Sequence, residues 1–448
     1  MNALPTLLAS AQTLLPEIVA ARRTLHRRPE VGLQLPGTQA FVVAELERMG
    51  LTPRRGKSVG SVTAVIEGTK GSAKSTDGGA AESAHGSAAG ASAEGTKGTN
   101  SAGTNRAAAS TNASDAGHPG PTVLLRGDMD GLPLHEDTGL EFASETGDTM
   151  HACGHDTHMA MLLGAARLLL DRRDQFRGNV LLMFQPGEEG WHGARYMIED
   201  GVLESAPSPV EAAFAIHITN RYPSGQVRLR PGPMYAAADR IRITVRGRGG
   251  HASAPHLTLD PIPSAAEIVL ALQMLVTRTV DVFDPTVITI AHLLAGTRDN
   301  IVPETALIEG TIRTVSEATR ARMRDGVLRI ANGICAAHGT SAEVEIEPGY
   351  PVTMNDASFT GLVSDVAGEL LGSGSVAIEP VPDMGAEDFS YVLQRVPGAM
   401  ARLGGRPADV DEATAPQNHS NRVVFDEPAM AVGAALHAAV ALRYLGGA

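Results

Sequence analysis

Two hydrophobic periodicities alternate along the first half of the chain. Apolar side chains recur at helical spacing over 4–28, around 38–49 and over 157–170, which predicts three helices. Short apolar runs instead predict buried strands, at 61–66, 121–126, 178–185 and 212–216. Alternating helices and strands favour an α/β fold: a mixed, mostly parallel sheet with helices on both faces.

The pattern changes over residues 234–348. Strands and helices are predicted there in the order β-α-β-β-α-β, at 240–246, 261–280, 286–291, 306–313, 318–337 and 342–346. This order is typical of a ferredoxin-like α+β module. We therefore expect a small domain, 234–348, inserted between the two parts of a larger one, 1–233 and 349–448. In the second part, 382–389 is predicted to open a helix, and 429–445 forms an apolar helix.

One segment matches neither pattern. Alanine is the only hydrophobic residue type in 69–120, among Gly, Ser, Thr and Asn. Such a composition cannot bury enough apolar surface to offset the entropy of ordering. We predict a disordered insertion that projects between two strands, and we interpret its His85 and His118 as incidental.

Composition and charge narrow the class of protein. The 448 residues, 43% of them hydrophobic, are enough for two domains. A net charge of −13 argues against nucleic-acid and membrane-surface partners. No apolar run could span a bilayer, and no secretory signal is recognisable. Two distant cysteines give no disulfide framework, so a cytoplasmic location is expected.

The densest chemistry lies in Met150–His158, which holds three imidazoles, a thiol and a carboxylate. Cys153 and His155 are two residues apart, so a turn could direct both at one centre. A borderline-soft ion such as Zn²⁺ or Mn²⁺ accepts thiolate and imidazole together. Cys335, by contrast, is interpreted as a structural residue on an apolar helix face, and His437 as a core or surface histidine.

Three predicted strands deliver polar groups at their carboxyl ends: Asp128 and Asp130, Glu188 and Glu189, and His217. The aspartates form either a solvated turn or a carboxylate that orients a metal-bound histidine. Adjacent glutamates after a buried strand are costly without nearby positive charge, which a metal would supply. A Gly-rich loop at 247–256 carries two more histidines, but its glycines do not have phosphate-loop spacing.

Together these motifs resemble the M20 metallopeptidase/amidohydrolase family, in particular its N-acyl-amino-acid, hippurate and auxin-conjugate amidohydrolases. The resemblance covers most of the chain outside 69–120, with the motifs in family order: Leu25–Glu30, Gly127–Pro133, Met150–His158, Gln185–Glu189, Gly249–Ser253, Asn300–Pro303, Gly385–Phe389 and Asn418–Ser420. It implies a zinc-exopeptidase-like catalytic domain and an inserted domain that dimerises.

The resemblance also implies a site with two divalent metal ions per subunit, Zn²⁺, Mn²⁺, Co²⁺ or Ni²⁺. The residues at its ligand positions are Cys153, His155, Glu189, His217 and His419. The resemblance implies that Glu188 is the general base of a metal-activated water. Cys153 stands where other members have a bridging aspartate, and a thiolate there favours softer metals.

Further roles follow from the same resemblance. Many members carry His-x-Asp where this chain has Asp128-Met129-Asp130, so Asp130 is expected to orient a ligand. His251 matches a histidine that reaches the partner subunit's site in a homodimer or tetramer, where it would stabilise an oxyanion. Substrate binding is expected from Asn300 and Arg313. His151 and His158 are interpreted as residues that support the ligands or cap a helix rather than as ligands. The roles of Asp128 and His256 stay open.

Four functions remain compatible with these residues. The first is an amidohydrolase of N-acyl amino acids, and the second is a dipeptidase or carboxypeptidase on the same centre. The third is a non-catalytic metal-binding or metal-sensing protein, which the intact Glu188 disfavours. The fourth is a hydrolase with Cys153 as nucleophile, which would tolerate a chelator but not an alkylating agent.

Overall fold

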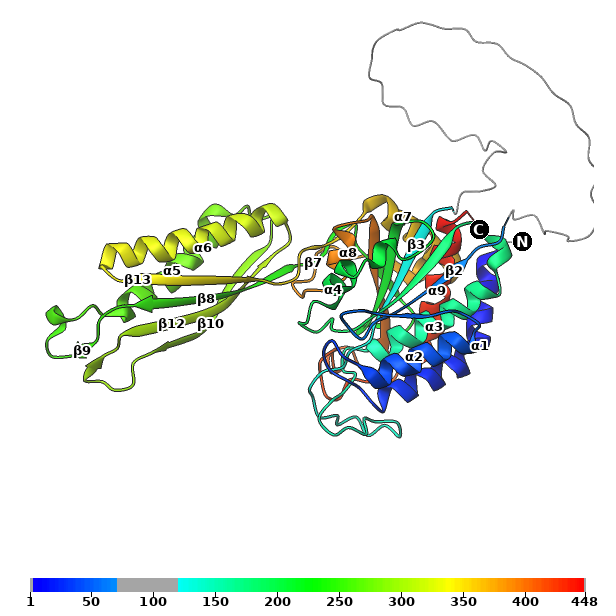
Figure 1. Cartoon of the computed structure of the whole chain (residues 1–448), viewed down its shortest axis with the longest axis horizontal. Coiled ribbons are helices and arrows are strands. Elements are labelled where there is room, and N and C mark those ends of the chain that lie inside the picture. The colour runs from blue at the N-terminus through cyan, green and yellow to red at the C-terminus, as the bar shows by residue number, and fades with distance from the viewer. Residues whose placement is uncertain (1–2, 71–119, 447–448) are drawn as a thin grey trace, which may run out of the picture.

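The computed structural model describes residues 3–70 and 120–446 (Figure 1). The predicted disordered insertion, with His85 and His118, lies almost entirely outside the described residues. Within the described ranges, no helix combines the length and apolarity that crossing a bilayer would require.

The larger domain is built on an eight-stranded sheet with the order β1-β2-β4-β3-β5-β16-β6-β15. β3, β4, β5 and β16 run parallel at its centre, whereas β2 pairs with β4 in the antiparallel sense. The strands are β1 (Arg54–Arg55), β2 (Val62–Glu67), β3 (Thr122–Asp128), β4 (Asn179–Gln185), β5 (Val210–Pro223), β6 (Val227–Leu229), β15 (Val376–Ile378) and β16 (Gly398–Arg406).

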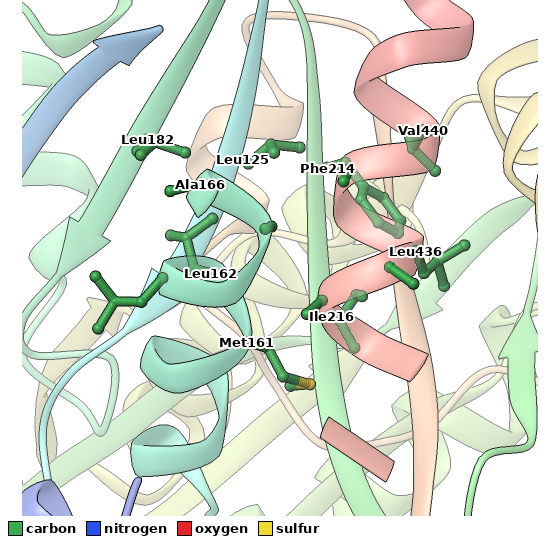
Figure 2. Close-up of a cluster of buried hydrophobic side chains, with 14 of the residues drawn as sticks. Leu125, Met161, Leu162, Ala166, Leu182, Phe214, Ile216, Leu436 and Val440 are labelled. Atoms are coloured by element: carbon green, nitrogen blue, oxygen red, sulfur yellow. The ribbon is translucent and has the colours of Figure 1, made fainter. Parts of the chain in front are cut away.

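Helices cover both faces of this sheet. One face packs against α1 (Ala3–His26), α2 (Pro36–Arg48), α3 (His155–Leu170), α7 (Ala357–Leu371) and α9 (Ala429–Tyr444). The other face packs against α4 (Gly193–Glu199) and α8 (Ser390–Leu393). Leu125 faces the first core and Leu124 the second, because successive residues of a strand point to opposite faces. Figure 2 shows Phe214 and Ile216 of β5 beside Leu436 of α9.

The smaller domain is a four-stranded antiparallel sheet with the order β10-β12-β8-β13 and its own core. Its chain order is β8 (Ala237–Arg246), α5 (Pro261–Thr279), β10 (Thr286–Ala295), β12 (Thr305–Thr314), α6 (Glu317–His338) and β13 (Ser341–Pro348). This is the predicted β-α-β-β-α-β order. Figure 1 shows it as a separate lobe, joined to the larger domain near β7.

Short elements complete the fold: β7 (Gly232–Tyr235), β9 (Gly250–His251), β11 (Ile301–Val302), β14 (Thr353–Asn355), η1 (Arg173–Gln175), η2 (Val202–Glu204), η3 (Pro255–Leu257) and η4 (Ser373–Ser375). β9 pairs with β11, and β7 pairs with β14. The first pair lies at the tip of the smaller lobe that is farthest from the larger sheet (Figure 1).

The predicted fold class is confirmed, with two local corrections. The strand predicted to end before His217 continues to Pro223, so His217 lies within β5 rather than at its end. Residues 382–389 do not open a helix, and α8 begins only at Ser390. Side chains there bind backbone N–H groups instead, Asp383 that of Gly385 and Glu387 that of Phe389, which competes with helix formation.

Candidate metal centre and active site

Cys153 and His155 reach the centre of the larger domain through a sharp turn into α3. Gly154 forms this turn with φ +87°, and a Cβ there would lie 2.5 Å from a methyl carbon of Ile218. Only glycine combines that conformation with that contact, so the thiol and the imidazole point together from the start of the helix. His419 also has a positive φ, +71°, and its N–H donates to the carbonyl of Ala152.

The structure brings the five residues at the predicted ligand positions into two groups that share Cys153. One group is Cys153, His155 and His217, and the other is Cys153, Glu189 and His419. Within each group the donor atoms all lie within 4.8 Å of one another. Cys153 Sγ is 3.4 Å from His217 Nε2, and Glu189 Oε1 is 3.0 Å from His419 Nε2. A shared thiolate between two such groups is a geometry suited to a pair of cations.

Carbonyl groups fix the orientation of two of these histidines. Nδ1 of His155 lies 2.7 Å from the carbonyl oxygen of Asp130, and Nδ1 of His217 lies 2.8 Å from that of Ile218. A carbonyl only accepts, so each Nδ1 carries a proton, and in the neutral imidazole the lone pair is therefore on Nε2. Nε2 of His155 is buried and has no hydrogen-bond partner among the described residues. An orphaned buried nitrogen of this kind fits a metal ligand.

Asp130 orients the neighbouring glutamates as well as His155. Its carboxylate accepts hydrogen bonds from the backbone N–H of Glu188 at 2.9 Å and of Glu189 at 3.0 Å. Asp130 thus fixes three side chains of the centre, one through its carbonyl and two through their own backbone.

His158 does not offer a free nitrogen to the centre. Its Nε2 accepts a hydrogen bond from the N–H of Ile218 at 2.8 Å, so its Nδ1 is the donor to Asp128 at 2.6 Å. Burial lowers the pKa of His158, which favours the neutral imidazole. Asp128 and His158 therefore link β3, α3 and β5 behind His217. His151 is also buried, with neither ring nitrogen hydrogen-bonded within the described residues.

A buried guanidinium organises the carboxylates behind Glu188. Arg126 contacts Asp128 at 2.5 Å, Glu387 at 2.9 Å and Asp388 at 3.1 Å. Burial and the neighbouring charges of Glu387, Glu189 and Asp388 raise the pKa of Glu188 well above its usual value. Sequence reasoning assigned no role to Arg126 or Glu387. The available signal was an arginine inside the apolar run 121–126, because a buried charge requires partners.

The electrostatics of the cluster favour a cation. Burial alone would lower the pKa of His155, but the carboxylates of Asp128 and Asp130 raise it to about 10. Burial and the charges of Glu189 and Glu188 raise the pKa of the Cys153 thiol. A cation held here would offset these charges and favour the thiolate, which fits a metal ligand better than a free cysteine nucleophile.

The centre opens into a cavity of about 530 Å³, a size typical of small-molecule sites. Both domains contribute to its wall. The larger domain provides Cys153, Glu188, Glu189, His217, Arg221, Tyr235, Glu387, Arg402, Asn418 and His419. The smaller domain provides Asp239, Arg240, Thr311, Arg313 and Glu347. Arg313 is half-buried and donates to the carbonyl of Met384 at 3.4 Å.

Two predicted site residues do not line this cavity in their own chain. His251 lies opposite Ile301 in the β9–β11 pair, and Asn300 accepts a hydrogen bond from Ala252 N at 3.1 Å. Both therefore sit together at the exposed tip of the smaller domain (Figure 1). His256 is also exposed there, in η3. Sequence spacing could not reveal this separation, because it depends on how the smaller lobe extends away from the larger sheet (Figure 1).

Comparison with known proteins agrees with this arrangement. Residues 124–443 match the model of peptidase family M20/M25/M40. The chain is 37% identical to thermostable carboxypeptidase 1 of Saccharolobus solfataricus over 95% of both chains. It is 33% identical to the IAA-amino acid hydrolase ILR1-like 4 of Arabidopsis thaliana, over 96% of this chain and 86% of that one.

A solved structure of an M20 family member is also similar to this chain. A dinuclear metal-binding peptidase of the M20 family from Bacillus subtilis is 28% identical, with a TM-score of 0.75, and the match covers 98% of this chain and 100% of that one. The predicted family resemblance is thereby confirmed. The protein is a metal-dependent hydrolase of amide bonds, and its chain belongs to peptidase family M20/M25/M40.

Proposed function

We propose that this hydrolase cleaves the amide bond of N-acyl amino acids at a two-metal centre, releasing a carboxylate and a free amino acid. The observation that carries the proposal is the pair of donor groups that share Cys153. The IAA-amino acid hydrolase ILR1-like 4 from Arabidopsis and the dinuclear metal-binding peptidase from Bacillus support it by their similarity.

In this proposal the ions would be held by Cys153, His155, Glu189, His217 and His419, and Cys153 belongs to both donor groups. The mixed sulfur, nitrogen and oxygen donors suit Zn²⁺, Mn²⁺, Co²⁺ or Ni²⁺. When bound, the ions would polarise the scissile carbonyl and lower the pKa of a bound water towards about 7.

Glu188 is the general base of the proposed reaction. It lines the cavity, it is buried, and Asp130 holds its backbone N–H. Burial and nearby carboxylates raise its pKa, which suits a group that takes a proton from water and returns it to the leaving amine. Tyr350 donates a hydrogen bond to the backbone carbonyl of Glu188. The backbone of Glu188 is therefore held in place, and its side chain approaches the substrate from this fixed position.

His251 is proposed to act on the site of a partner subunit in a homodimer or tetramer. Ser253 N donates to Nδ1 of His251 at 3.1 Å, so Nε2 carries the proton and can donate to an oxyanion. β10 supports association because it is an edge strand with exposed Leu293 and Leu294. Asn300, beside His251, would then contact the substrate from the same partner.

A carboxypeptidase or dipeptidase is the second candidate, favoured by the similarity to thermostable carboxypeptidase 1. A substrate panel separates the two functions in protein reconstituted with Zn²⁺, Mn²⁺, Co²⁺ or Ni²⁺. N-acetyl and N-benzoyl amino acids should be hydrolysed faster than unblocked dipeptides and N-blocked peptides. Faster hydrolysis of the peptides would select the second candidate. Metal binding without hydrolysis of any substrate would contradict both.

The role of Glu188 is tested by Glu188→Gln, which preserves shape but removes the base. We expect kcat to fall by about 10³-fold while two metal ions per subunit remain bound, measured by elemental analysis. Glu199→Gln is the matched control, because Glu199 is exposed on α4 and pairs only with Arg195. Substantial turnover by Glu188→Gln would exclude Glu188 as the base.

A further inference from the structure

Two arginines and one aspartate form a cluster on the cavity wall next to the metal centre. Arg221 Nη1 lies 2.8 Å from Asp383 Oδ2, and Arg402 Nη2 lies 2.7 Å from the same oxygen. All three residues line the cavity. The second oxygen of Asp383 accepts the N–H of Gly385 at 2.7 Å, so both oxygens of the carboxylate are in use.

Arg402 is fixed in place beside the centre. It lies directly opposite His217 in the parallel pairing of β16 with β5, which directs both side chains to the same face of the sheet. Its guanidinium stacks 4.7 Å from the ring centroid of Tyr235, and its Nε donates to the Tyr235 hydroxyl at 3.0 Å. The side chain is only 7% exposed. The side chain lines the cavity, and its Nη1 makes no hydrogen bond with any described residue.

This side of the cavity has an excess of positive charge. Arg221 and Arg402 share the single carboxylate of Asp383, and Arg313 contributes a third guanidinium with no carboxylate partner among the described residues. The acidic side chain of Asp239, also on the wall, is already paired with Arg320 and Arg324. A substrate with one carboxylate would satisfy Arg313 and leave the Arg221–Arg402 pair with a net charge of about +1.

We propose that Arg402, assisted by Arg221, binds a second carboxylate of the substrate, so that the enzyme prefers N-acyl amino acids with two negative charges. Arg313 binds the α-carboxylate. A planar guanidinium fixed by stacking and by an aspartate is preorganised for a carboxylate, and it loses little side-chain entropy on binding. The inference rests on the proposed amidohydrolase function and names the substrate class of that site.

The second carboxylate can come from either side of the scissile bond, and the substrates distinguish the two sources. N-acetylglutamate carries it on the amino acid, N-succinylmethionine carries it on the acyl group, and N-acetylmethionine lacks it. We expect kcat/KM of the metal-loaded enzyme to be at least about tenfold higher for one of the first two than for N-acetylmethionine. The preference should shrink as salt is raised, because Arg221 is partly exposed.

Arg402→Met should lower the ratio of kcat/KM between the preferred dianionic substrate and N-acetylmethionine by about tenfold or more, mainly through KM. Arg221→Gln should lower the same ratio by a smaller factor. This variant keeps the Arg402–Asp383 pair, so it tests the inference even if Arg402→Met does not fold. Arg228→Gln is the control. Arg228 lies opposite Arg402 on β6, stacks on Tyr222 and does not line the cavity, so activity should not change.

Equal kcat/KM for all three substrates in the wild-type enzyme would overturn the inference. So would an equal loss on N-acetylmethionine in Arg402→Met, which would make Arg402 the ligand of the α-carboxylate. Calorimetric titration of metal-loaded protein with glutamate and with succinate provides a readout independent of turnover. Weaker binding by Arg402→Met supports the subsite even if no N-acyl amino acid is hydrolysed, in which case the proposed function alone would fail.

Discussion

Two fully buried histidines, His155 and His437, have opposite pKa shifts because His155 lies beside carboxylates. Burial lowers the pKa of both, since it penalises the charged imidazolium. Near His155 the carboxylates of Asp128 and Asp130 outweigh burial and raise the pKa to about 10. His437 lies on α9 and packs against the ring of Phe214. Burial lowers the pKa of His437 to about 3. Neighbouring carboxylates, rather than depth, account for the difference between these two histidines.

The buried neutral state of His437 predicts a pH dependence of stability. Between pH 6.5 and about 3 the unfolded chain binds a proton at His437 that the folded chain does not, so stability falls as pH falls through this window. His437→Leu should remove this contribution and reduce the slope by up to about 1.4 kcal/mol per pH unit. Urea unfolding at a series of pH values measures it. An unchanged slope, equal to that of a variant of exposed His256, would contradict the prediction.

At the scale of elements, the turn between β4 and α4 positions the two glutamates. Gly193, the first residue of α4, donates its N–H to the carbonyl of Gly187 at 3.0 Å. A Cβ at Gly193 would lie 1.6 Å from the carbonyl oxygen of Pro186. The helix and the turn therefore approach each other through backbone alone, and this contact fixes the segment that carries Glu188 and Glu189.

Gly193→Ala should displace this turn and weaken the metal centre. Because the contact is with backbone, it cannot be relieved by a side-chain rotation, so we expect at least about tenfold weaker metal binding together with lower kcat. Competition with a chelator measures the affinity. Gly361→Ala in α7 is the matched control: nothing lies within 4 Å of its added Cβ, and it should stabilise the helix by up to about 1 kcal/mol. Equal metal affinity in both variants would argue against the positioning role.

At the scale of the whole molecule, the segment 71–119 enters and leaves the fold at the end of the sheet opposite the active site. Glu67 of β2 and Thr122 of β3 both pair with Asn179, the first residue of β4. Glu188 and Glu189 follow the other end of β4, and the two ends of a strand of this length are about 20 Å apart. The two flanks of the segment therefore lie on either side of one strand, about 10 Å apart.

Replacing 71–119 by a short Gly/Ser linker should leave kcat/KM within about twofold of the value for the unaltered chain. The linker has only to cross β4, and no cavity residue lies near its ends. Steady-state kinetics and metal content of the shortened enzyme test this. A large loss of kcat with metal still bound would show that the segment contributes to function.

The exposed position of His251 leads to a second prediction, which concerns how two subunits would share an active site. If His251 serves a partner's site, Glu188→Gln and His251→Ala subunits should complement each other. Each mixed dimer then contains one site with both groups intact and should regain about half of wild-type activity. Differently tagged, co-expressed subunits purified in tandem provide the mixed dimer. An inactive mixed dimer, with both parent variants also inactive, would place His251 and Glu188 in function within one chain.

Sequence periodicity was sufficient for most elements of the fold. Apolar runs such as 178–185 and alternating patterns such as 240–246 appear as β4 and β8, because burial of one or both faces leaves a direct trace in the sequence. Periodicity does not predict the structure correctly where side chains compete for backbone hydrogen bonds. Residues 382–389 are an example, because Asp383 and Glu387 bind backbone N–H groups there. The continuation of β5 beyond His217 was missed for a related reason, since polar residues such as Asn220 interrupt its apolar run.

The sequence by itself determined the fold class, the family and the candidate donors, because these depend on residue types at short spacings. Only the tertiary structure decided how the donors combine: two groups sharing Cys153, from segments as distant as His155 and His419. It also decided that Arg126 holds the carboxylates behind Glu188 and that Arg402 faces the cavity. Such contacts depend on strand order and register, and spacing along one chain does not specify which distant strands become neighbours.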